Sequence, residues 1–294
     1  AEQYGIRMCS GDTIGPGGVF RTLREFPVIM DCCKDVEAIC PDAWVINYIN
    51  PTAAHGVGLK RFAPQLKSFA LCDGLHMPHV KRRYAQAAGI VPEETGYTDE
   101  IGAAFDMRIA GVNHFTWMIV GKYEGRDVTP AIAETIRRMA ITETEADGSI
   151  RGDRGAKAKF NASIGYALYE AFGYVPTCVA HTKEYLPFWQ GRGVLEEAVP
   201  PLTLWETEPR YQRHAAMWKQ VDDFNRGATP IGDYMTTFGP DHATDIIENI
   251  VGNLGKPFFI STANQGAVPN MADDACLEML CDVDMEGARP RPGG

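Results

Sequence analysis

Apolar residues in the first part of the chain follow two patterns, one typical of helices and one typical of strands. From residue 17 to Ile39 they return every three or four positions, which predicts a helix that Pro27 bends. Trp44–Ile49 and Ser68–Cys72 are short, mostly apolar runs bounded by turn residues, as in buried parallel strands. A weaker helical pattern covers Thr52–Phe62, between the two runs. This strand, helix, strand order predicts part of a parallel sheet.

The rest of the chain continues this alternation and then becomes mixed. Residues 105–110 and 115–122 predict two strands joined by a corner at residues 111–114. The same criteria predict helices at 77–88, 130–141, 157–172, 211–224 and 242–250, and strands at 257–262 and 276–283. Residues 287–294 read as a loop. The pattern therefore predicts an α/β fold that passes into α+β.

Composition changes this picture mainly by exclusion. The 294 residues include 28 Lys and Arg and 38 Asp and Glu, which gives a formal net charge of −10. Nucleic acids and anionic membrane surfaces attract a basic face, and this chain has no such surplus. No apolar stretch approaches the ~20 residues of a membrane-spanning helix. We therefore expect neither partner, and a length that allows two domains of about 150 residues each.

Cysteine usage and the N-terminus predict a compartment. Eight cysteines are few for a disulfide scaffold of this length, and Cys32 and Cys33 are adjacent. No signal segment with a basic and then an apolar region is visible at the start. These features predict a cytoplasmic protein. Because the chain does not open with Met and its end reads as a loop, we expect it to be part of a longer gene product.

Cys72 and His114 are the first candidates for chemistry, because thiolates and imidazoles bind transition metals. A cysteine at a strand end is more often a small core residue than a metal ligand. A single histidine carries equally little information. The two residues are also too far apart in the sequence to form a local metal motif. Their residue types alone therefore leave both readings open.

Two glycine- and amide-rich segments offer a second kind of site. Gly11–Gly18 precedes the first predicted helix, and a glycine-rich entry to a helix can present backbone N–H groups to a phosphate or carboxylate. It lacks the G-x-G-x-x-G spacing, however, and no strand precedes it, so a tight turn explains it equally well. Asn264–Gly266 and Asn270 leave the same choice, between a turn and a sugar-binding edge.

Seven short motifs are spread over nearly the whole chain, from about residue 5 to residue 287. In order they are Gly11–Gly18, Cys40–Ala43, Asn47–Pro51, Leu71-Cys72, Ala110–His114, His181–Tyr185 and Asn264–Gly266. In wording and order they resemble glycoside hydrolase family 4, and particularly its melibiase-like α-galactosidase branch. One such match would mean little, but seven collinear matches make the resemblance specific.

The resemblance implies a partial Rossmann-like parallel sheet, without its first βα units, and an α+β catalytic lobe, as in lactate and malate dehydrogenases. Residues 1–110 would be the remaining part of the dinucleotide-binding domain. Residues 111–294 would be a substrate- and metal-binding domain that is incomplete at its C-terminus. Enzymes of the family use NAD⁺ and a divalent metal, usually Mn²⁺, where most glycosidases use paired carboxylates. They oxidise C3 of the sugar, eliminate the C1 substituent after loss of the C2 proton, add water and reduce C3 again.

The family's site residues can be carried over where the motifs match. Cys72 and His114 resemble the metal ligands, so a sulfur and a ring nitrogen should lie within roughly 3–5 Å of each other. Asp12 resembles the acid that assists the leaving group. Asn50 resembles the residue that touches both the sugar and the nicotinamide.

The remaining assignments are less direct. Asn113 and Asn264 are expected to contact the sugar. Some family members place an Asp or a Tyr as the C2 base shortly after a Gly-x-x-Pro turn, but residues 174–180 contain no carboxylate. Tyr185 and His181 are therefore the candidates for the base, and the alternative is that they merely line the pocket.

The cofactor loop is where this sequence departs from the family. Family members begin with a strand, a Gly-x-Gly-Ser turn and a helix that hold the NAD⁺ pyrophosphate, and nothing in this chain matches them. The chain is then either a core fragment or a protein that has lost this part. Residues 1–294 alone should bind NAD⁺ too weakly to detect, show no Mn²⁺-dependent glycosidase activity, and self-associate along the exposed strand edge at 44–49.

The resulting functional prediction is an NAD- and Mn²⁺-dependent glycosidase acting on an α-galactoside-like or uronide substrate. One alternative is a sugar or hydroxy-acid dehydrogenase, since the fold is shared with such enzymes by analogy. Another is a non-catalytic remnant that lacks the cofactor loop. The expected partners are a small glycoside and further copies of the chain in a homo-oligomer.

Overall fold

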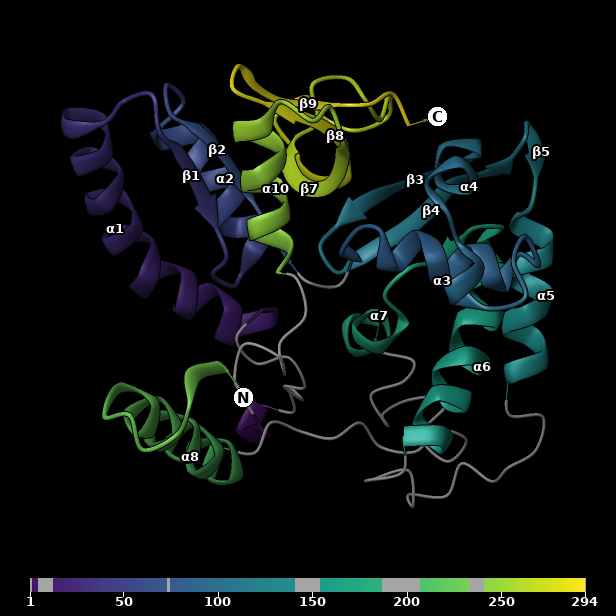
Figure 1. Ribbon diagram of the computed structural model, residues 1–294, viewed down its shortest axis with the longest axis horizontal. Coiled ribbons are helices and arrows are strands. Elements are labelled where there is room, and N and C mark those ends of the chain that lie inside the picture. The colour runs from purple at the N-terminus through teal and green to yellow at the C-terminus, as the bar shows by residue number, and fades with distance from the viewer. Residues whose placement is uncertain are drawn as a thin grey trace.

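The computed structural model describes residues 2–4, 13–72, 75–140, 154–186, 207–232 and 241–293 (Figure 1). Its helices are η1 (Glu2–Tyr4), α1 (Gly15–Ile39), α2 (Thr52–Phe62), α3 (His79–Ala87), η3 (Glu94–Gly96), α4 (Asp99–Ala104), α5 (Thr129–Met139), α6 (Arg154–Phe172), α7 (Val179–Tyr185), α8 (Thr207–Asn225) and α10 (His242–Gly252). Its strands are β1 (Trp44–Asn47), β2 (Lys67–Ala70), β3 (Phe105–Val112), β4 (Phe115–Tyr123), β5 (Arg126–Asp127), β6 (Val175–Pro176), β7 (Pro257–Ala263), β8 (Cys276–Asp284) and β9 (Gly287–Pro290). Each helix and strand expected from the sequence pattern has a counterpart here, with ends that differ by a few residues.

The helix ends follow the residues that the sequence supplies. α1 contains Pro27 in its interior and ends just before Pro41. Gly89 and Gly173 follow the ends of α3 and α6, with φ of 72° and 76°. These left-handed conformations suit glycine, which has no Cβ to clash. The two helices therefore stop where the pattern predicted.

One sheet has five strands in the order β1-β2-β7-β8-β9. β1 and β2 are parallel, from Trp44 opposite Lys67 to Asn47 opposite Ala70, and the other pairs are antiparallel. The parallel pair, with α2 as its crossover, confirms the βαβ prediction. Among the described strands β1 lies at the edge of the sheet, as expected; self-association along it stays a prediction.

The end of the chain corrects the sequence analysis. Residues 287–294 were expected to be a loop, but β9 pairs with β8 in register. In the turn between them, a carboxylate oxygen of Asp284 accepts hydrogen bonds from the N–H groups of Glu286 and Gly287. β9 is an edge strand, where Pro290 is tolerated because no further strand needs its missing N–H. A segment rich in proline and glycine therefore concealed a short strand.

The second sheet consists of β3, β4 and β5 in that order, with β6 also paired to β4. β3 and β4 form a hairpin whose register continues to Val112 opposite Phe115. Asn113 and His114 are therefore the two residues of its turn. This tight turn fixes the position of His114 relative to the sheet.

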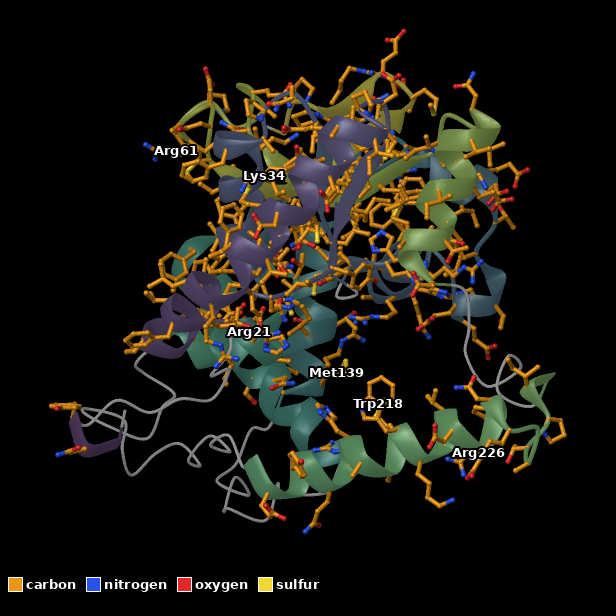
Figure 2. The ribbon with its side chains drawn as sticks, turned by 90° about the vertical axis from the view of Figure 1, so that its left-hand side faces the viewer. Arg21, Lys34, Arg61, Met139, Trp218 and Arg226 are labelled. Carbon is orange, nitrogen blue, oxygen red and sulfur yellow. The ribbon has the colours of Figure 1, made fainter. Side chains whose placement is uncertain are left out.

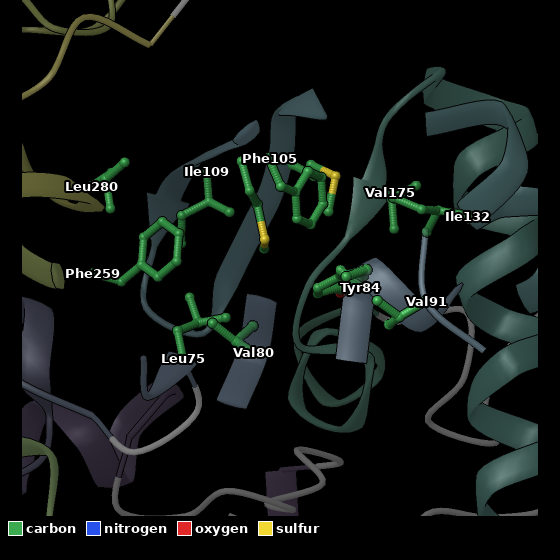
Figure 3. Close-up of a cluster of buried hydrophobic side chains, with 13 residues drawn as sticks. Leu75, Val80, Tyr84, Val91, Phe105, Ile109, Ile132, Val175, Phe259 and Leu280 are labelled. Atoms are coloured by element: carbon green, nitrogen blue, oxygen red, sulfur yellow. The ribbon is translucent and has the colours of Figure 1, made fainter. Parts of the chain in front are cut away.

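A shared hydrophobic cluster joins the two sheets (Figure 3). Phe105, Met107 and Ile109 enter it from β3, and Phe259 and Leu280 enter it from β7 and β8. Each of these side chains is at most 6% exposed. Burying an apolar side chain of this size contributes about 1.5–3 kcal/mol. The two sheets are therefore joined through a packed core.

The division into residues 1–110 and 111–294 stays a prediction. The five-stranded sheet takes β1 and β2 from the first of these ranges and β7, β8 and β9 from the second. The chain thus leaves this sheet after β2, builds the second sheet and its helices, and returns. Residues far apart in sequence are brought to one place by that return.

α8 lies apart from the two sheets in both views of the ribbon (Figures 1 and 2). Its side chains are mostly exposed, including Trp218 at 72%. No helix in the described ranges combines the length and the apolar character that crossing a membrane requires.

Candidate active site

Cys72 and His114 meet where the two sheets join. Cys72 follows the carboxyl end of β2, and His114 lies in the turn between β3 and β4. The Cys72 sulfur is 3.0 Å from Nε2 of His114 and 3.8 Å from Nδ1. This distance confirms the proximity predicted for two residues that no local motif connects. Their role as metal ligands stays a prediction.

The hairpin turn depends on a glycine at its base. Gly111 has a φ of 154°, and a Cβ added there would lie 2.1 Å from the backbone oxygen of Phe115. Any larger residue would push the two strands apart at this point. The Ala110–His114 motif therefore combines the glycine that permits the turn with the histidine that the turn presents.

Asn113, the other residue of the turn, is anchored to the first sheet. Its Nδ2 donates a hydrogen bond of 3.0 Å to Oε2 of Glu278 on β8. Both side chains are buried, and Glu278 is only 1% exposed. Burial raises the pKa of the Glu278 carboxyl to about 7, and the hydrogen bond from Asn113 opposes this only partly. The turn that carries His114 is thus hydrogen-bonded to a carboxyl group whose pKa is raised by burial.

α7 brings two further side chains to His114. The sulfur of Cys178, the residue before α7, lies 3.3 Å from Nδ1 of His114. The ring of His181 stacks on the ring of His114, with centroids 4.4 Å apart and planes inclined by 28°. The structure therefore places one candidate base, His181, directly against a candidate metal ligand. Cys178 was not among the residues predicted for the site.

Asn50 lies at the corresponding end of the neighbouring strand. β1 and β2 run parallel, so Asn50 and Cys72 both follow the carboxyl ends of adjacent strands. Oδ1 of Asn50 accepts a hydrogen bond of 2.8 Å from the Thr52 hydroxyl. Nδ1 of the buried His55 lies 3.1 Å from the backbone oxygen of Ile49 and supports the same segment. In open α/β sheets this edge is where ligands bind.

Asn264 holds a turn through its side-chain amide. Its Nδ2 donates to the backbone oxygens of Val268 and Met271, and its Oδ1 accepts from the N–H of Val268. The side chain is completely buried. Of the two readings that the sequence left open, the geometry favours a turn held by Asn264, while sugar binding by this residue stays a prediction.

The other two assignments can be placed only in part. Asp12, the expected acid, lies outside the described residues. Tyr185 is half-buried and comes one turn after His181 on α7. The choice of base between these two α7 residues is therefore not decided by their positions.

Two models of one protein family match the chain. The model described as "Family 4 glycosyl hydrolase" matches residues 1–87, and "Family 4 glycosyl hydrolase C-terminal domain" matches residues 109–294. The second match alone covers more than half of the chain. The chain belongs to glycosyl hydrolase family 4. The family inferred from the seven motifs is thereby confirmed.

Curated relatives of this chain differ in the sugars that their names specify. The alpha-galactosidase of Bacillus subtilis (strain 168) is 28% identical over 294 residues, which cover 98% of this chain and 60% of the relative. The alpha-galacturonidase of Thermoanaerobacter italicus (strain DSM 9252 / Ab9) is 29% identical over 191 residues, or 64% of this chain and 40% of the relative. The chain thus spans at most about 60% of these two proteins.

A solved structure supports the fold class. The 6-phospho-alpha-glucosidase from gut microorganisms, determined in complex with NAD and Mn²⁺, aligns with a TM-score of 0.67. The alignment covers 96% of this chain and 60% of that one at 21% identity. A likeness at this identity concerns the fold, and it confirms the predicted Rossmann-like α/β class.

Proposed function

We propose that the gene product is a glycosidase that oxidises and re-reduces its sugar with NAD⁺ and requires a divalent metal, with Mn²⁺ as the expected ion. The observation that carries this proposal is the meeting of Cys72 and His114, 3.0 Å apart, beside the edge of the sheet that bears Asn50. The names of the relatives support an α-galactoside or a galacturonide as substrate.

The donor pair fits a metal ion. Two donors that each lie ~2.0–2.3 Å from one ion must themselves be close together, and a sulfur and a nitrogen 3.0 Å apart meet this condition. When bound, the metal would act as a Lewis acid that polarises the oxygens at C2 and C3 of the sugar. In this chain Cys72 and His114 would hold it, and geometry and availability would select the ion because affinity alone does not favour Mn²⁺.

The sheet edge fits a nicotinamide. Asn50 follows the carboxyl end of β1, next to the end of β2 that Cys72 follows, so Asn50 would hold a nicotinamide beside the residues that would hold the metal. When bound, NAD⁺ would accept the hydride from C3 and later return it. The task of Asn50 is to orient, and its side chain is already fixed by the hydroxyl of Thr52.

One of two side chains on α7 is proposed to act as the base at C2. His181 or Tyr185 would take the C2 proton, which becomes acidic once C3 is a ketone. His181 is held against the His114 ring, so a proton acceptor lies beside the proposed metal. Asp12 would protonate the departing oxygen at C1. Asn113 would contact the sugar from the hairpin turn.

We expect this proposal to be visible in a glycoside assay of the full-length gene product. Release of nitrophenol from nitrophenyl α-galactoside or α-galacturonide should require both Mn²⁺ and NAD⁺, with no net formation of NADH. In D₂O, the released sugar should carry deuterium at C2, because elimination removes that proton and water addition replaces it. Displacement by paired carboxylates leaves C2 untouched. Hydrolysis without either cofactor, or unlabelled product, would contradict the proposal, and accumulating NADH would indicate a dehydrogenase.

The same assay separates the candidate bases. His181→Gln and Tyr185→Phe each remove one proton acceptor, and loss of a general base typically lowers turnover by about 10²–10⁴. The variant lacking the true base should also form C2-deuterated sugar correspondingly more slowly, while the other variant should form it at nearly the wild-type rate. If both variants retain deuteration at the wild-type rate, neither residue is the base and both line the pocket.

A further inference from the structure

The imidazole of His114 has a thiol against each of its nitrogens. Cys72 approaches Nε2 at 3.0 Å, and Cys178 approaches Nδ1 at 3.3 Å. Cys72 is further from Nδ1, at 3.8 Å, so the two sulfurs lie at different positions around the ring. His181 stacks on the face of the same ring. The ring is therefore contacted at both nitrogens and on one face.

The position of Cys178 relative to His114 is fixed by the strand that precedes it. The N–H of Thr177 donates to the backbone oxygen of Thr116 at 3.0 Å, and the two threonine hydroxyls lie 2.6 Å apart. Both threonine side chains are buried. Thr116 is only two residues beyond His114, so the hydrogen bonds between Thr116 and Thr177 keep Cys178 close to His114. After Cys178 the chain is also held, because its backbone oxygen accepts from Thr182 at 2.9 Å.

A histidine that binds a metal through one nitrogen usually donates its other N–H to a nearby acceptor, which fixes the tautomer and the orientation of the ring. Here Nε2 faces Cys72, the proposed partner in metal binding, and Nδ1 faces Cys178. We infer that Cys178 is a positioning residue for His114. Its sulfur accepts a hydrogen bond from Nδ1–H and so keeps the proton off Nε2, whose lone pair is then available to the metal. This inference rests on the proposed function, because it concerns the same metal.

The inference predicts the tautomer of His114 without any metal present. In the metal-free, ¹⁵N-histidine-labelled protein, two-bond ¹⁵N–¹H correlation spectra should show His114 protonated at Nδ1 near neutral pH. His114→Gln identifies the signal by removing it. Cys178→Ser keeps a hydrogen-bond acceptor and should keep this tautomer, whereas Cys178→Ala should shift the population toward Nε2–H. A wild-type His114 protonated at Nε2 would overturn the inference, whatever the variants do.

The second test measures metal affinity. Loss of the outer partner of a metal-binding histidine typically weakens metal binding about 10–100-fold. We expect that loss for Mn²⁺ binding to Cys178→Ala, measured by electron paramagnetic resonance, and a change of only a few-fold for Cys178→Ser. Cys40→Ala removes an exposed thiol at the end of α1 and should bind Mn²⁺ as the wild type does.

Two outcomes keep this inference separate from the proposed function. If the wild type fails to bind Mn²⁺, or if Cys72→Ser binds it normally, the proposed function fails. If Cys72→Ser loses binding while Cys178→Ala retains it, only the role of Cys178 fails. Substitution with Co²⁺ adds a check, because the sulfur-to-cobalt absorption should disappear in Cys72→Ser and persist in Cys178→Ser. Its loss in Cys178→Ser would make Cys178 a metal ligand and overturn its role as a positioning residue.

Discussion

Replacement of Cys72 by serine is expected to weaken Mn²⁺ binding at least about 100-fold, since even the loss of a ligand's outer partner costs about 10–100-fold. A serine hydroxyl stays protonated at neutral pH and is a poorer ligand than a thiolate. The change replaces one atom in a half-buried side chain, so the fold should survive it. Titration of Mn²⁺ by electron paramagnetic resonance measures the affinity, and circular dichroism checks the fold.

The matched control for this variant is Cys40→Ser. Cys40 is also a free thiol, but it is exposed at the end of α1, whereas Cys72 follows β2. It should leave the Mn²⁺ affinity of the protein unchanged. The dependence of glycoside hydrolysis on Mn²⁺ concentration should move with the measured affinity of Cys72→Ser. If Cys72→Ser were activated by Mn²⁺ at the same concentration as the wild type, Cys72 would not be a metal ligand.

The regular elements were predictable because their signal is local. α2 has the predicted bounds, and the helices before Gly89 and Gly173 end where glycine allows a left-handed conformation. β9 was missed because it is held as a strand by its pairing with β8, and its own sequence has no pattern typical of strands. Pro290 and the neighbouring glycines are typical of loops, and only the position at a sheet edge makes a strand acceptable there.

The candidate site divides in the same way. Cys72 and His114 carry motifs that resemble the family, and the fold then brings them within 3.0 Å. Cys178 carries no such motif, and it reaches His114 because β6 pairs with β4 at Trp117, three residues beyond the hairpin turn. Its spacing of three residues from His181 on one helical turn was the available signal. Glu278 had even less, because a single acidic residue within an apolar strand does not reveal what it faces.

Glu278 gives the second large prediction, which concerns stability. Its carboxyl group has an ordinary pKa in the unfolded chain, near 4.5, and burial raises the pKa to about 7 in the folded protein. Between these pH values the folded protein holds a proton that the unfolded chain has released. The free energy of unfolding must therefore decrease as pH rises through this interval, and the contribution of Glu278 is fully present below pH 4.5. The loss across the interval is on the order of 3 kcal/mol.

Glu278→Gln should remove this dependence. Glutamine is neutral at every pH and can still accept the hydrogen bond from Nδ2 of Asn113 through its amide oxygen. Its own buried N–H groups carry a cost, but that cost is the same at all pH values. The diagnostic quantity is therefore the difference in the free energy of unfolding between variant and wild type, measured by urea denaturation from pH 4.5 to 8. That difference should change in favour of the variant as pH rises.

A surface carboxylate supplies the comparison. Glu248→Gln changes an exposed residue on α10. A plot of its free energy of unfolding against pH should run parallel to that of the wild type across the same range. If the free energy of unfolding of Glu278→Gln also runs parallel to that of the wild type across this pH range, Glu278 has no raised pKa.

If the pH dependence of the free energy of unfolding changes as expected, a second consequence follows for the turn that presents His114. Ionised Glu278 strengthens its hydrogen bond with Asn113 while costing the fold stability, because a charged acceptor binds an N–H more strongly than a neutral one. Above pH 7 the protein should then hold this turn more firmly and unfold more easily. Amide hydrogen exchange at Asn113 and His114, compared with the rate of exchange through global unfolding, distinguishes the two effects.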